Sequence, residues 1–275
     1  MVDTREIVSR IFTGAELARG GFTRELKTVL GLLHDLPRWW VGYTKNCGLH
    51  VHVGLPLQNP VLAPHCLGPL RRLAVLSIVC ERAMEGIATR APDLDYAEAI
   101  GQRYFHPMMP ADEEVCEYVL RTRTIYDLQQ AMLSWRQDTV RFETQRVKHQ
   151  RRATLWAGER YFRMAFQPLA SQRGHGEQGH GTVEFRVHQG TVGRMKIEMW
   201  VKVCVGMVRT CAEMGDTEFR MLLRREGGRR MGTRRFLECF VRDPEAVEYY
   251  VLAQALDGDE EMEDDTSDRD CTCPA

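Results

Sequence analysis

The 275-residue chain contains no uninterrupted apolar stretch near the roughly 18 residues that a membrane-spanning helix needs. Its first residues, MVDTREIVSR, lack the apolar run of a secretion signal. These two absences argue against a membrane partner and favour an intracellular, cytoplasmic protein. The nine cysteines are odd in number and scattered through apolar stretches, so they do not fit a disulfide framework. We expect buried thiols.

Lysine is also scarce, because only five of the 37 basic residues are lysine and the rest are arginine. Arginine suits the recognition of phosphate and carboxylate groups, although a GC-rich coding bias explains the excess equally well. Six arginines lie in 224–235. This segment is interpreted either as a solvated loop or as a contact surface for a polyanion. Interleaved aromatic residues are missing there, so a nucleic-acid partner is not expected. Acidic residues gather in 257–275, which is expected to be disordered and dispensable for folding.

The periodicity of the apolar residues predicts both helices and strands, with no internal repeat. The two strand segments alternate apolar and polar residues strictly, and they do not alternate regularly with the helices along the chain. This order favours an α+β fold over a parallel α/β fold. The predicted helices span 22–36, 66–89, 112–134, 193–214 and 244–256, and the predicted strands span 47–55 and 182–188.

The first strand, 47–55, places two imidazoles on one face. Successive side chains of a strand point to opposite faces, so His50 and His52 share the face that lies opposite the apolar residues. Gly48 and Gly54 flank them and leave space above the sheet. Such an arrangement favours a ligand or metal site, while a pair of half-exposed surface histidines is the simpler alternative.

The second strand, 182–188, repeats this design. Its alternation predicts that Glu184, Arg186 and His188 share one face, opposite three apolar residues. A surface ion pair between the first two would contribute little to stability. We predict, however, that both strands belong to one antiparallel sheet with their polar faces aligned, so that the carboxylate and the guanidinium meet the two imidazoles in one concave pocket. Carboxylate and imidazole suit a divalent cation, and guanidinium suits phosphate.

Together, the segments CGLHVHVG (47–54) and TVEFRVHQGT (182–191), followed by a helix containing Trp200, resemble the amidoligase family of fungal type. This family belongs to the glutamine-synthetase-like carboxylate–amine ligases. The resemblance extends back to the segment 6–9 and covers roughly 4–212. It implies a twisted antiparallel sheet flanked by helices, with a glutamine-synthetase-like core. It further implies an ATP-dependent joining of a carboxylate to an amine through an acyl phosphate.

The resemblance also assigns roles to individual residues. His50 and Glu184 correspond to ligands of the cation that bridges the nucleotide phosphates, and Glu6 to a ligand of a companion cation. His52 corresponds to a contact with a nucleotide phosphate, and Arg186 to the catalytic residue that steadies the transferring phosphate. The implied cofactors are ATP and Mg²⁺ or Mn²⁺. The implied partners are a small-molecule carboxylate and an amine.

The family domain normally opens with a strand of closely spaced glutamates, which is not found before Glu6. The segment 1–256 is therefore expected to be an N-terminally incomplete domain with impaired or no activity. Either Arg90 or Arg103 occupies the region of a substrate-side arginine. Two other classes stay open. One is a non-catalytic pseudo-ligase or polyanion-binding module, and the other is a metal-dependent hydrolase of the amidohydrolase type, whose barrels also carry His-x-His on a strand.

Overall fold

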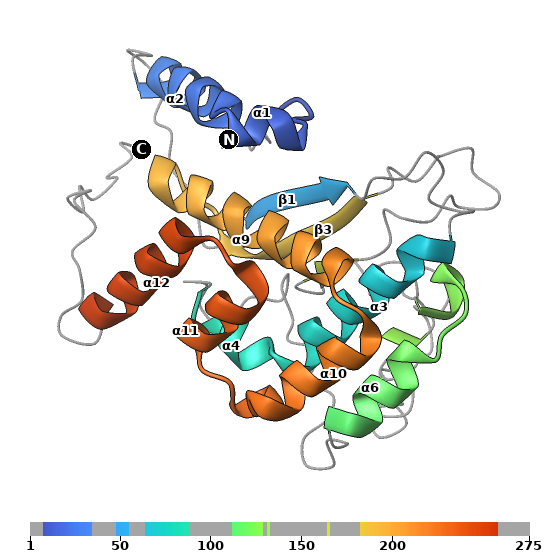
Figure 1. Ribbon diagram of the computed structural model, residues 1–275. Coiled ribbons are helices and arrows are strands. Elements are labelled where there is room, and N and C mark those ends of the chain that lie inside the picture. Colours follow the sequence, from blue (N-terminus) through green and yellow to red (C-terminus); the bar gives the residue numbers. More distant parts are fainter. Residues whose placement is uncertain are drawn as a thin grey trace, which may run out of the picture.

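The structure is a computed structural model that describes residues 8–34, 48–54, 64–87, 112–128, 131–132, 164–165 and 182–257. Helices pack on an antiparallel sheet (Figure 1), so the fold is of the mixed α+β kind that the sequence predicts. In the described residues the strand order is β1-β3-β2. The strands are β1 (Gly48–Gly54), β2 (Met164–Ala165) and β3 (Thr182–Gln189).

The two strands predicted to carry the chemistry are neighbours in this sheet. Antiparallel pairing brings His52 opposite Glu184 and Gly54 opposite Thr182. On the other face of β1, the apolar side chains are partly buried and pack against the main hydrophobic core. The alternation of polar and apolar residues therefore fixes which face of β1 looks away from the core.

The ladder contains one irregularity. Between the pairs Leu49–His188 and Val51–Phe185, β3 has one residue more than β1. Two residues of β3 thus oppose the single residue His50, which defines a β-bulge. Beyond the bulge the alternation of β3 is shifted by one residue, and the side chain of His188 lies on the core face. The sequence-based expectation that His188 shares the polar face is wrong for this reason.

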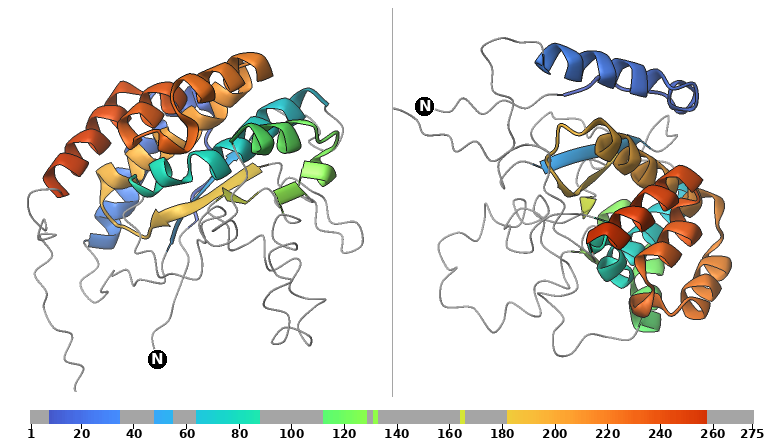
Figure 2. Two further views of the ribbon diagram at one scale, coloured as in Figure 1. Left: turned by 90° about the horizontal axis from the view of Figure 1, so that it is seen from below. Right: turned by 90° about the vertical axis from the view of Figure 1, so that its left-hand side faces the viewer.

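The central helix of the core is α9 (Arg194–Glu213), which agrees with the predicted helix 193–214. It packs against β1, α3 (Pro64–Val79), η3 (Leu237–Val241) and α12 (Pro244–Asp257). Figure 2 shows these helices on one side of β1 and β3. Because α9 has neighbours on several sides, it buries far more than one apolar stripe. Its buried residues include Trp200, Val203, Cys204, Gly206, Met207 and Cys211.

At the N-terminal side, α1 (Gly14–Ala18) and α2 (Gly21–His34) form a helical pair at the edge of the molecule, and α2 contacts α9 (Figures 1 and 2). A capping box starts α1, since the Thr13 hydroxyl accepts from the Glu16 backbone N–H while the Glu16 carboxylate accepts from the Thr13 backbone N–H. Neither helix contains a fully buried side chain. Helix α2 confirms the prediction over 22–36, although its apolar stripe is only half-buried.

Two predicted helices are interrupted. The segment 66–89 kinks at Cys80, which separates α3 from α4 (Glu81–Glu85), although backbone hydrogen bonds continue through the kink. The segment 112–134 breaks after α6 (Asp112–Leu120). Here the hydroxyl of Thr124 accepts a hydrogen bond from the backbone N–H of Asp127 at 2.9 Å. This side-chain cap starts a new helical turn and explains the break.

The arginine-rich segment 224–235 is not an open loop. It comprises the end of one helix, a 3₁₀ turn and a further short helix, and five of its six arginines pair with carboxylates. The Nε atom of Arg229 lies 3.0 Å from Asp112, and Arg235 donates to Glu226 at 2.6 Å. Hydrogen bonds from Arg235 and, to a smaller extent, from Arg225 lower the pKa of Glu226 to about 2. These pairs weaken the polyanion-binding alternative. The elements are α10 (Asp216–Arg225), η2 (Gly228–Arg230) and α11 (Thr233–Phe236).

The cysteines of the described residues are free and buried, as the sequence predicts. Burial raises the pKa of the Cys116 thiol to about 11 and that of Cys211 to about 12, so the reactive thiolate is nearly absent at pH 8. These six thiols are Cys66, Cys80, Cys116, Cys204, Cys211 and Cys239.

Iodoacetamide at pH 8 is therefore expected to leave these six cysteines unmodified in the folded protein and to modify all of them after denaturation, as measured by peptide mass mapping. Burial raises the pKa of the thiols in the folded state, which makes the free energy of unfolding depend on pH. Their contribution to stability is complete below pH 9, the ordinary thiol pKa, and is lost as the pH rises toward 11–12. Modification of Cys211 in the native protein at pH 8 would contradict its burial.

None of the helices in the described ranges combines the length and the apolar character needed to cross a bilayer.

Candidate functional site

One carboxylate oxygen is the centre of the polar face of the sheet. The Oε1 atom of Glu184 accepts a hydrogen bond from Nη1 of Arg186 at 2.8 Å. Nδ1 of His50 lies 3.3 Å from the same oxygen, and Nε2 of His52 lies 3.7 Å from it. The other ring nitrogen of His52 lies 3.3 Å from the hydroxyl of Thr182. Three nitrogen-bearing side chains thus converge on a single oxygen.

The sheet supplies this convergence through simple geometry. His52 and Glu184 are cross-strand partners, so their side chains emerge next to each other on one face. Arg186 follows two residues after Glu184 on β3, and His50 precedes His52 by two on β1, which keeps all four on that face. The four side chains lie at different depths. Only 10% of the Glu184 side chain and 16% of the Arg186 side chain are exposed, against 27% for His50 and 46% for His52.

The structure therefore brings together four of the five site residues suggested by the sequence. The fifth, Glu6, lies outside the described residues, as do the substrate-side candidates Arg90 and Arg103 and the tail 258–275. The prediction that the polar faces of the two strands align in one antiparallel sheet is confirmed.

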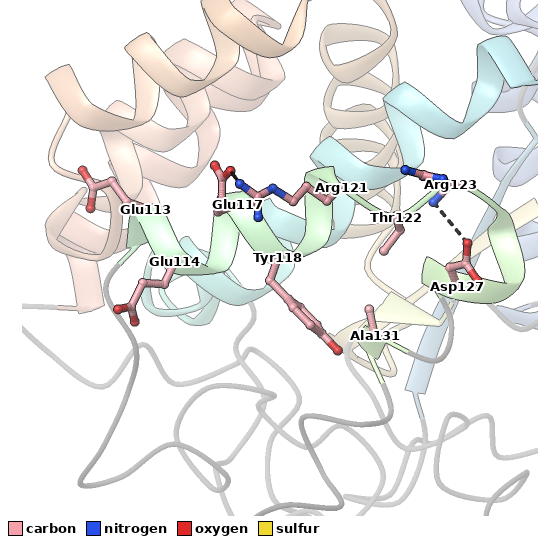
Figure 3. A pocket seen from close by; sticks show the side chains of 9 residues that line it. All are labelled: Glu113, Glu114, Glu117, Tyr118, Arg121, Thr122, Arg123, Asp127 and Ala131. Atoms are coloured by element: carbon pink, nitrogen blue, oxygen red, sulfur yellow. Dashed lines mark hydrogen bonds and ion pairs between the residues drawn. The ribbon is translucent and has the colours of Figure 1, made fainter.

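Two cavities in the described part of the chain lie away from this face, over which a concave pocket was predicted. A cavity of about 950 Å³ is lined by α6 and the turn after it (Figure 3), and one of about 470 Å³ lies beside α12. Carboxylates on the first cavity, such as Glu117, are already paired with arginines. Neither cavity brings unassigned chemistry together. The residues lining the first are Glu113, Glu114, Glu117, Tyr118, Arg121, Thr122, Arg123, Asp127 and Ala131.

A divalent cation needs more than the polar face offers. Within the described ranges, no group of three or more His, Cys, Asp or Glu residues is arranged to hold a metal ion. The Glu184 oxygen that faces both imidazoles is already bonded to the guanidinium of Arg186, whose positive charge would repel a cation at the same point. Mg²⁺ in particular requires near-octahedral oxygen coordination. The described residues alone therefore do not fit a complete metal site.

Sequence reasoning misplaced one residue near the site and missed another. His188 is buried because of the bulge, and its ring packs against Trp200 at a tilt, with 5.3 Å between the ring centroids. Thr182, at the start of β3, reaches His52 and was missed. It could have been found from the sequence, because strand alternation places Thr182 on the same face as Glu184.

No family model, no curated protein and no solved structure matches this chain. The assignment of a function therefore depends on the residues themselves.

Proposed function

We propose that this chain is an ATP-dependent carboxylate–amine ligase with a glutamine-synthetase-like core, acting through an acyl phosphate. The single observation that carries the proposal is the convergence of two imidazoles and one guanidinium on a nearly buried carboxylate, on the polar face of an antiparallel sheet. The antiparallel pairing of β1 and β3 also argues against the hydrolase alternative, because (β/α)₈ barrels consist of parallel strands.

The proposed reaction has two steps. An oxygen of the substrate carboxylate attacks the γ-phosphorus of ATP, the bond to ADP breaks, and an acyl phosphate forms. The amine nitrogen then attacks the acyl carbon, the carbon–oxygen bond to phosphate breaks, and the amine loses a proton as the amide forms. Phosphorylation turns a poor leaving group into a good one. The energetic demand lies in stabilising the charge on the phosphoryl oxygens.

In this proposal Arg186 donates to the phosphoryl oxygens and Glu184 orients it. A guanidinium carries five N–H donors in a fixed fork, more than one carboxylate oxygen can accept, so the pair is compatible with a further anion. His52, the most exposed of the four side chains, contacts a nucleotide phosphate. ATP is the proposed nucleotide. No step of the proposal is assigned to a divalent cation, because the guanidinium of Arg186 is bonded to the Glu184 oxygen that His50 and His52 face.

The test is the release of ADP from ATP with a pool of amino acids and dicarboxylates, together with calorimetry of ATP binding. We expect Arg186→Gln to reduce amine-dependent turnover by at least about a hundredfold, the scale typical for losing one transition-state donor. Arg194→Gln is the matched control, since Arg194 also pairs with a mostly buried glutamate, Glu198, but lies outside the cluster. It is expected to change turnover less than about twofold.

Three outcomes decide between the candidate functions. Amine-dependent turnover that is lost in Arg186→Gln supports the ligase. Tight ATP binding without turnover across all substrates supports the pseudo-ligase alternative. Neither binding nor turnover contradicts both and requires a different function for the polar face.

A further inference from the structure

The side chain of His188 occupies an unusual place for an imidazole. Only 2% of the residue is exposed, and its ring packs against Trp200, which also meets Phe185 edge-on. Its Nδ1 atom lies 2.7 Å from the backbone carbonyl oxygen of Gln189, the last residue of β3. A buried polar ring requires such a partner, and an aliphatic residue would fill the same space without one.

The β-bulge explains why this ring is buried. In a ladder without the bulge, Arg186 alone would lie opposite His50, and residue 188 would emerge on the polar face opposite Gly48. In the observed ladder, residue 188 pairs with Leu49 instead, and both Arg186 and Val187 oppose His50. A bulge bends its strand and increases the local twist, which changes the direction in which the neighbouring side chains leave the strand.

The bulge changes the direction of Arg186, the residue on which the proposed chemistry depends. Arg186 is the first residue of the bulge, and its guanidinium returns along the strand to Glu184 at 2.8 Å. The two sides of the bulge are thus fixed by different contacts. The ion pair to Glu184 holds the side before the bulge, and the packing of His188 on Trp200 holds the side after it.

We infer that His188 is a positioning residue that fixes the β1–β3 register by its burial against Trp200, and thereby aims Arg186 at the phosphate-binding face. A slip of one residue would remove the bulge, expose the imidazole and leave the surface of Trp200 without the ring that packs against it. The inference rests on the proposed function only for its ligand measurement. The register itself is measured without any ligand.

The register is read from cross-strand nuclear Overhauser contacts of Leu49 by NMR. In the wild-type protein Leu49 is expected to contact residue 188, whereas a ladder without the bulge gives contacts to Val187. His188→Phe keeps an apolar ring beneath Trp200 and should keep the contact. His188→Glu, or His188→Gln if the charged variant does not fold, should move the contact to Val187. An unchanged register in every folded His188 variant would overturn the inference.

The effect on Arg186 is measured by calorimetry with ATP as the probe. His188→Gln is expected to weaken ATP binding about tenfold, the scale of one hydrogen bond to a charged group. In an Arg186→Gln background the same substitution should have no further effect. His188→Phe should stay within about twofold of the wild type. Val183→Ala, which removes buried side-chain volume on the regular part of β3, is the control for a general loss of stability and should also stay within about twofold.

If His188→Gln weakened ATP binding equally in the presence and in the absence of the Arg186 guanidinium, the positioning role would be overturned. If wild-type ATP binding is not observed, the proposed function fails, and the NMR comparison alone still decides whether His188 holds the register.

Discussion

The Glu184→Gln variant is expected to unfold with a free energy about 2 kcal/mol smaller than that of the wild type. The substitution leaves the guanidinium of Arg186, only 16% exposed, without the opposite charge at 2.8 Å. Removing one partner of a mostly buried ion pair costs more than the pair itself contributes, because the remaining charge stays desolvated. Urea unfolding with linear extrapolation measures the change. The same variant should also lose the amine-dependent release of ADP.

A double-mutant cycle separates this ion pair from a general effect of the substitution. Glu184→Gln, Arg186→Gln and the double variant should give a coupling energy of about 1.5 kcal/mol or more, because the double variant no longer carries an uncompensated charge. Arg194 and Glu198 supply the matched cycle. They lie 3.4 Å apart with Arg194 43% exposed, and we expect about 0.5 kcal/mol or less. Equal coupling in both cycles would contradict a specially stabilised cluster on β1 and β3.

The second large effect is expected at Gly206 on α9. A Cβ atom added there would lie 2.4 Å from the backbone carbonyl oxygen of Val241 and 3.0 Å from its Cα atom. Val241 ends the π-helical turn η3, and the next residue, Arg242, has a left-handed φ of 57° and donates its N–H to the carbonyl of Leu237. This backbone cannot retreat without losing its own hydrogen bond. Gly206→Ala should therefore destabilise the fold by about 3 kcal/mol.

Gly31→Ala is the matched control for Gly206→Ala. Both glycines lie inside helices, so both substitutions gain the same helix propensity of up to about 1 kcal/mol. A Cβ atom at Gly31 meets nothing within 4 Å. Gly31→Ala should therefore be neutral or slightly stabilising in the same urea experiment. If Gly206→Ala behaved like Gly31→Ala, α9 and η3 would not be packed as closely as the structure has them.

The local sequence pattern predicted which face of the strands the site residues occupy on the part of the β1–β3 ladder before the bulge. Strict alternation placed His50, His52, Glu184 and Arg186 on one face, because the period of two residues is a property of the strand itself. The same argument failed at His188, since a bulge adds one residue to one strand of a pair and cannot be read from that strand alone. The position of the imidazole depends on Leu49, which is distant in sequence, and on its packing against Trp200 of the following helix.

The helices likewise have some features that the local sequence predicts and others that it does not. Apolar periodicity over 193–214 predicted α9 to within a residue or two, because a long helix in the core repeats its pattern many times. The break after α6 was missed, although its signal is local: the hydroxyl of Thr124 competes for the backbone N–H of Asp127. Apolar periodicity continues across the break and hides it. The sequence could not show whether the arginines of 224–235 are solvated or paired, because their carboxylate partners include Asp112 on α6, which is distant in sequence.

By itself, the sequence determined the class of the fold, the two strands, the faces of their polar residues and the chemical character of the candidate site. These features follow from periods of two and 3.6 residues, which depend only on neighbours along the chain. Only the tertiary structure decided that β1 and β3 are partners, that a single Glu184 oxygen receives all three nitrogen groups, and that His188 is buried under Trp200. The first two facts depend on the register between segments more than 100 residues apart, and the third depends on a bulge and on a contact with the next helix; local periodicity specifies none of these.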